Sequence, residues 1–113
     1  MVANNDLAVD ISEKEFEETI NNPNGLTVVD FYAEWCMPCL MIAPVIEELA
    51  SKFTKIKFAR VNIDENHPLS SRCEVSSIPC LIVFKKGQEV ERIIGALPEE
   101  IIEEKIMKHI TQS

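Results

Sequence analysis

Apolar residues recur along the chain at two spacings, which predict strands and helices in alternation. The stretch from Leu26 to Ala33 is almost continuously apolar and rich in β-branched residues, as is typical of a central strand buried on both faces. The other runs that predict strands are Leu7–Ile11, Ile56–Ile63, Cys80–Phe84 and Val90–Ile94.

Capping residues and helical spacing predict the segments between these strands. Ser12 followed by Glu15 is a capping box that starts the first helix. A second helix begins at or just after Cys36, and Pro44 within it removes a backbone donor and should bend it. The remaining helices are predicted at 66–73 and from 98 to about 110.

The predicted order is β-α-β-α-β-α-β-β-α. A βαβ unit followed by a hairpin and a helix indicates an α/β fold, with a mixed central sheet and helices on both faces. The sequence has no repeats and no linker, so we expect a single domain over residues 1–113, with 1–6 as a loose N-terminal segment.

Composition excludes several functional classes. The chain has 113 residues, of which 46% are hydrophobic and 27% charged, as in ordinary globular domains. Its net charge of −8 disfavours nucleic-acid binding, which needs a basic surface. The longest apolar runs are too short to span a membrane, and the first residues lack the basic and apolar regions of a secretory signal.

Four cysteines leave several kinds of site open. Cys36 and Cys39 form a C-x-x-C pair, which is typical of a redox dithiol or of half a metal site. An extracellular disulfide scaffold and a pair of packed, reduced cysteines are the other interpretations. The spacing of Cys73 and Cys80 and the separation of the two histidines disfavour a structural zinc site.

The position of the C-x-x-C pair favours redox chemistry. It lies between a buried strand and the first turn of a helix, where unpaired backbone N–H groups stabilise an anion such as a thiolate. Cys36 comes first and should be the exposed attacking thiol. Cys39 lies about one turn later, should be more buried, and would resolve the mixed disulfide. Pro38 is tolerated in the first helical turn.

The chain resembles the thioredoxin family from roughly Leu7 to Ile110. The resemblance rests on Trp35-Cys36-Met37-Pro38-Cys39, on Asp30 upstream, and on the later Ile78-Pro79 and Gly95-Ala96. It implies a three-layer α/β/α thioredoxin fold, in which four helices flank a mixed five-stranded sheet. It also implies a cytoplasmic, monomeric protein-disulfide reductase that carries electrons without a bound cofactor or metal. A thioredoxin reductase and multiple disulfide-containing client proteins would be its partners.

The resemblance also implies roles for individual residues. Cys36 matches the nucleophile and Cys39 the resolving thiol. Asp30 matches a buried acid, whose raised pKa suits a general base that takes the Cys39 proton. Pro79 matches a cis-proline that presents the Ile78 backbone to an extended substrate. The implied substrate-binding residues are Trp35, Met37, Pro38, Ile78, Pro79, Gly95 and Ala96.

Several positions depart from the family pattern. Met37 replaces a glycine and leaves the redox potential open, and Leu40 replaces a lysine near the thiols. Arg60 replaces a lysine and, because it stays charged, should restrain the rise in the Asp30 pKa. Tyr32 replaces a tryptophan. Cys80 replaces a threonine after Pro79, a position expected near the dithiol, where a small buried side chain is the preferred interpretation.

Three other functions stay open on sequence grounds. A disulfide oxidant or isomerase uses the same scaffold at a higher reduction potential. A redox-independent binding module would need neither thiol of the C-x-x-C pair. A metal carrier would use Cys36, Cys39 and Cys80 as ligands. A cysteine protease is disfavoured, because neither histidine has a sequence context that places it beside Cys36.

Overall fold

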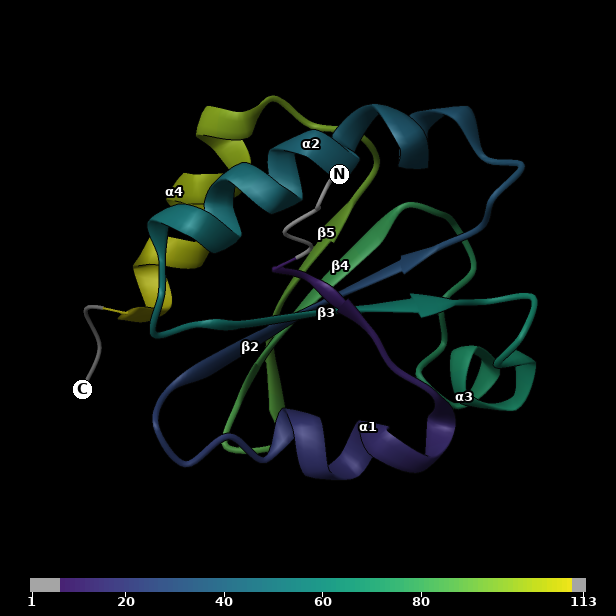
Figure 1. The fold of residues 1–113 in the computed structure, drawn as a ribbon, viewed down its shortest axis with the longest axis horizontal. Helices are drawn as coiled ribbons and strands as arrows, with labels where there is room; N and C mark the ends of the chain where they lie inside the picture. The colour runs from purple at the N-terminus through teal and green to yellow at the C-terminus, as the bar shows by residue number, and fades with distance from the viewer. Residues whose placement is uncertain (1–6, 111–113) are drawn as a thin grey trace.

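The computed structural model describes residues 7–110, so the segment 1–6, expected to be loose, lies outside the described residues. The centre of the protein is a five-stranded sheet (Figure 1). The strands are β1 (Val9–Asp10), β2 (Leu26–Tyr32), β3 (Lys57–Asn62), β4 (Cys80–Lys85) and β5 (Gln88–Ile94). They lie side by side in the order β1-β3-β2-β4-β5, which places β2 at the centre.

The sheet is mixed, as the element order predicts. β3 pairs in parallel with β1 on one side and β2 on the other, whereas β2 pairs antiparallel with β4, and β4 with β5. The β4–β5 hairpin turns at Lys86 and Gly87, whose φ angles are 52° and 83°. Two consecutive positive φ angles match the twist of a tight hairpin, and glycine adopts them without steric cost.

Four helices cover the two faces of the sheet among the described residues. They are α1 (Glu13–Ile20), α2 (Met37–Lys52), α3 (His67–Arg72) and α4 (Glu99–Ile110). Figure 1 shows α2 and α4 on one face, and α1 and α3 on the other. The predicted three-layer α/β/α thioredoxin fold is therefore confirmed.

Alternating side chains of the sheet supply two separate cores. Every residue of β2 is buried. Val28 belongs to the core beneath α2 and α4, whereas its neighbour Val29 belongs to the core above α1 and α3. Because successive strand residues point to opposite faces, this division also fixes where Asp30 lies: on the α2 face, two positions after Val28.

The ends of several elements differ from the sequence expectations. The first strand is only Val9–Asp10, because the amides of Leu7 and Ala8 donate to the Glu47 carboxylate at 2.8 and 3.1 Å instead of entering the sheet. Strand β5 begins at Gln88, directly after the turn. Pro44 lies within α2, and the bend predicted there stays a prediction.

A matched pair of substitutions in α4 tests the position of the core. Ile102 is 0% exposed and its neighbour Ile101 is 39% exposed. Ile102→Ala should lower the free energy of unfolding by about 2–5 kcal/mol, because it leaves a cavity in the packed core. Ile101→Ala should cost less than about 1 kcal/mol. Urea unfolding of the oxidised proteins measures both, and equal losses would contradict this packing.

Candidate active site

Cys36 and Cys39 form a disulfide at the N-terminus of α2, with their Cα atoms 5.2 Å apart. Cys36 is the N-cap residue, and its Sγ accepts a hydrogen bond from the Cys39 amide at 3.2 Å. The first turn of α2 contains no acidic residue. The helix N-terminus therefore presents a donor and a positive electrostatic potential to this sulfur, which would favour its thiolate form after reduction.

The two sulfur-bearing residues differ in exposure. Cys39 is 0% exposed and Cys36 is 4% exposed. Cys39 is therefore the more buried of the two, as predicted, but the expectation of an exposed Cys36 is wrong for the oxidised form. The reason is local packing, because Cys36 lies in a small apolar cluster with Tyr32 and Ala33, against which Ile78 packs.

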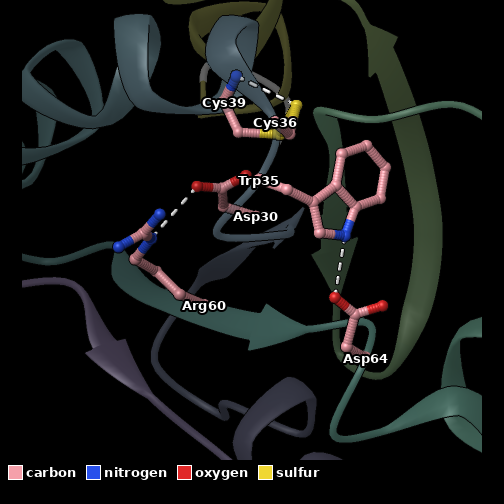
Figure 2. The surroundings of a disulfide bond; sticks show 6 residues. All are labelled: Asp30, Trp35, Cys36, Cys39, Arg60 and Asp64. Carbon is pink, nitrogen blue, oxygen red and sulfur yellow. Dashed lines mark hydrogen bonds and ion pairs between the residues drawn. A yellow bond between two sulfur atoms is a disulfide. The ribbon is translucent and has the colours of Figure 1, made fainter.

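Asp30 lies on β2 with 0% of its surface exposed, and Figure 2 shows it between Arg60 and the disulfide-bearing segment. Its Oδ2 accepts a hydrogen bond from the Arg60 Nε at 3.2 Å. Its Oδ1 is buried without a hydrogen-bond partner among the described residues. Burial raises the pKa of Asp30 to about 6, the Arg60 guanidinium opposes the rise as expected, and the charge of Asp10 adds to it.

Exposed apolar side chains precede and follow the cysteines along the chain. Trp35 is 69% exposed, and on the first turns of α2 Met37, Leu40 and Met41 are 67%, 51% and 68% exposed. Pro38 is exposed as well. The Trp35 indole Nε1 donates to the Asp64 Oδ2 at 2.9 Å, which fixes the ring beside the disulfide (Figure 2). Sequence reasoning assigned no role to Asp64, because nothing local in the sequence pairs it with Trp35.

The segment around Pro79 completes this surface. The Ile78–Pro79 peptide bond is cis, as predicted. The Gly95 amide donates to the Pro79 carbonyl at 2.9 Å and brings the exposed Ala96 to the same end of the sheet. Ile78 is half-buried against the disulfide cluster, and within residues 7–110 its backbone amide and carbonyl have no hydrogen-bond partner.

Cys80 does not join this group. Its side chain packs in the core above α1 and α3, with Phe31 and Ile82, rather than in the cluster around the disulfide. It is 1% exposed, and burial raises the pKa of its thiol. This is the small buried side chain that the sequence favoured, and the structure does not bring it to Cys36 and Cys39 as a third ligand. The described residues contain no group of three or more His, Cys, Asp or Glu side chains suited to a metal ion.

The fold and this site define a thiol–disulfide oxidoreductase built on the thioredoxin fold. The thioredoxin family model matches residues 8–108. A thioredoxin of Chlamydia pneumoniae is 44% identical over 99 residues, covering 88% of this chain and 95% of that protein. A thioredoxin of Staphylococcus saprophyticus is 43% identical over 103 residues, covering 90% and 97%. The chain belongs to the thioredoxin family.

Solved structures agree with this assignment. A mutant thioredoxin from Halobacterium salinarum superposes with a TM-score of 0.86 at 31% identity, covering 100% of this chain and 99% of that one. Plasmodium falciparum thioredoxin gives 0.82 at 35% identity, covering 90% and 98%. Across residues 7–110, none of the helices has the length and apolar character required to cross a bilayer.

The buried carboxyl makes a testable contribution to stability. In the unfolded chain an aspartate ionises near pH 4, whereas Asp30 in the folded protein holds its proton until about pH 6. The folded state therefore binds more protons between these values, and the stability contributed by Asp30 falls as the pH rises through this window. This difference between the folded and unfolded pKa of Asp30 corresponds to roughly 3 kcal/mol in the free energy of unfolding.

Asp30→Asn removes the titration. The free energy of unfolding of the oxidised variant, minus that of the wild type, should increase by about 2–3 kcal/mol between pH 4 and pH 7. Urea unfolding at a series of pH values measures this difference. A difference that stays constant, or that shrinks toward pH 7, would show that the pKa of Asp30 is not raised in the folded protein.

Proposed function

We propose that the protein acts as a disulfide reductant, in which Cys36 attacks and Cys39 resolves. The observation that supports this assignment is the asymmetry of the pair. Cys36 Sγ lies at the helix N-terminus and accepts a hydrogen bond from the Cys39 amide, and Cys36 keeps 4% of its surface exposed whereas Cys39 keeps none. A substrate disulfide approaching from solvent therefore meets Cys36 first.

The proposed reaction transfers two electrons in two exchange steps. The Cys36 thiolate attacks one sulfur of a partner disulfide, forms a mixed disulfide and releases the first partner thiolate. Cys39 then loses its proton and attacks the Cys36 sulfur, which releases the second partner thiolate and leaves the Cys36–Cys39 disulfide. The partner is reduced by two electrons, and the dithiol is oxidised by the same two.

Asp30 is the proposed acceptor of the Cys39 proton. Its carboxyl lies on the α2 face of β2 and has an oxygen without a partner among the described residues. A pKa of about 6 leaves the group ionised at neutral pH while making it a stronger base than an ordinary aspartate. Because the carboxyl is buried, a water molecule is the proposed carrier of the proton between the two residues.

The surface around the disulfide is the proposed docking site for partners. Trp35, Met37 and Pro38 provide exposed apolar contacts on one side of the disulfide. Ile78 provides a backbone amide and carbonyl that an extended substrate segment can pair with. Gly95 and Ala96 border the same end, where little side-chain bulk limits a partner's approach.

A reductant of this kind needs a source of electrons. We infer that a thioredoxin reductase returns two electrons to the Cys36–Cys39 disulfide and that multiple disulfide-containing proteins are the clients. The cytoplasm is the proposed location, because its thiol buffers keep such a pair reduced. We further propose that the protein works as a monomer, which leaves the docking surface open.

Variants of the two cysteines test their roles. In a Cys73→Ser background, which removes the half-buried free thiol, Cys39→Ser should trap client proteins as mixed disulfides, because the resolving thiol is absent. The matched Cys36→Ser protein should trap none. Non-reducing gels and mass spectrometry identify the adducts. Trapping by Cys36→Ser in place of Cys39→Ser would reverse the assignment.

The reduction potential tests the direction of electron flow. Equilibration in thiol–disulfide buffers can be followed by the fluorescence of Trp35, the single tryptophan of the chain. A potential near about −270 mV, typical of thioredoxins, is expected for a reductant. A value above about −180 mV would indicate an oxidant or isomerase and would also overturn the proposed location.

A further inference from the structure

Three charged residues form a row across adjacent strands on the face beneath α2. Arg60 on β3 is the register partner of Asp10 on β1 and of Asp30 on β2. Directly paired residues of neighbouring strands point to the same face. The Arg60 guanidinium therefore has a carboxylate on either side, yet among residues 7–110 its ion pair is with Asp30, at 3.2 Å.

Tyr32 spans this row from β2. Its hydroxyl donates to the Asp10 Oδ1 at 2.6 Å, and its ring lies under the Arg60 guanidinium, with the Cζ atom 3.8 Å from the ring centroid. Burial and the Asp10 hydrogen bond raise the pKa of Tyr32 to about 12, so the hydroxyl stays a donor. The side chain thus bonds to the competing carboxylate while its ring supports the guanidinium.

This arrangement restricts where a long, flexible side chain can place its charge. The Arg60 side chain is only 19% exposed. A cation–π contact is stronger when it is shielded from solvent, so the Tyr32 ring should hold the guanidinium more firmly here than at an exposed site. Glu47, the carboxylate that α2 presents near β1, is occupied by the Leu7 and Ala8 amides. Among the described residues of this face, Asp30 is the carboxylate that forms an ion pair with Arg60.

We propose that Tyr32 is a positioning residue that holds the Arg60 guanidinium against Asp30, with its ring under the guanidinium and its hydroxyl on the competing Asp10 carboxylate, and thereby keeps the Asp30 carboxylate ionised and ready to accept the Cys39 proton. The catalytic half of this inference rests on the proposed role of Asp30 as the base. The structural half, that Tyr32 keeps Arg60 beside Asp30, concerns only the ionisation of Asp30. It can be tested in the oxidised protein, where Cys36 and Cys39 do not titrate.

Titration of the Asp30 carboxyl carbon by NMR in the oxidised protein tests the structural half. Tyr32→Leu removes the ring and the hydroxyl, and Tyr32→Phe removes only the hydroxyl and releases Asp10. The titration midpoint of Asp30 should rise in the order wild type, Tyr32→Phe, Tyr32→Leu, Arg60→Gln. In the Arg60→Gln background, Tyr32→Leu should cause no further rise.

The direction of the change separates positioning from packing. If Tyr32 merely filled space, its removal would admit water to Asp30 and lower the midpoint. Phe58→Leu is the matched control, because it removes a buried ring from the face of β3 that carries Arg60. In this variant the titration midpoint of Asp30 should not rise. An unchanged or lowered midpoint in both Tyr32 variants, or an equal rise in Phe58→Leu, would overturn the inference.

A second readout addresses the catalytic half. Cys36 is loaded as a mixed disulfide with thionitrobenzoate, and the attack of Cys39 is followed by release of the coloured thiol. Tyr32→Leu should slow this release by about two- to fivefold at pH 6, the equivalent of one cation–π contact, and less at pH 8. A raised midpoint with an unchanged release rate would support the positioning of Arg60 and overturn the role of Asp30 as the base.

Discussion

The burial of one carboxyl group in the central strand is the constraint on which the active site depends. Asp30 is 0% exposed, and an isolated charge at such a position is costly unless it is paired. The sheet order satisfies this requirement, because it places β3, and with it Arg60, directly beside β2. Along the chain β2 ends just before α2, so the two cysteines lie close to the buried acid (Figure 2).

Much of this could be predicted from sequence, because the signals are local. The apolar run of β2, the capping box in which the Ser12 amide donates to the Glu15 carboxylate at 2.8 Å, and the position of the cysteine pair are all readable over a few residues. The spacing of Asp30, the cysteine pair and Pro79 indicated the family and therefore the fold. The disulfide between Cys36 and Cys39 followed from the same motif.

What sequence reasoning missed depends on contacts between distant segments. Trp35 and Asp64, which follow β2 and β3, and Tyr32 and Asp10, on β2 and β1, are far apart in the sequence and meet only when the sheet is assembled. The direction in which Cys80 points has a different, local cause, since a strand residue faces the opposite side from its neighbour. A motif places Cys80 next to Pro79 along the chain, but only the pleat places it in the other core.

Two exposed methionines at the start of α2 have a redox chemistry of their own. Met37 and Met41, which are 67% and 68% exposed, lie one helical turn apart in the first turns of α2, the helix that Cys36 caps. Peroxide converts an accessible thioether into a polar sulfoxide, and thiol–disulfide exchange does not reverse that change, which needs a dedicated sulfoxide reductase. The exposed start of α2, whose Met37 belongs to the proposed docking surface, can therefore carry an oxidation state separate from that of the cysteines.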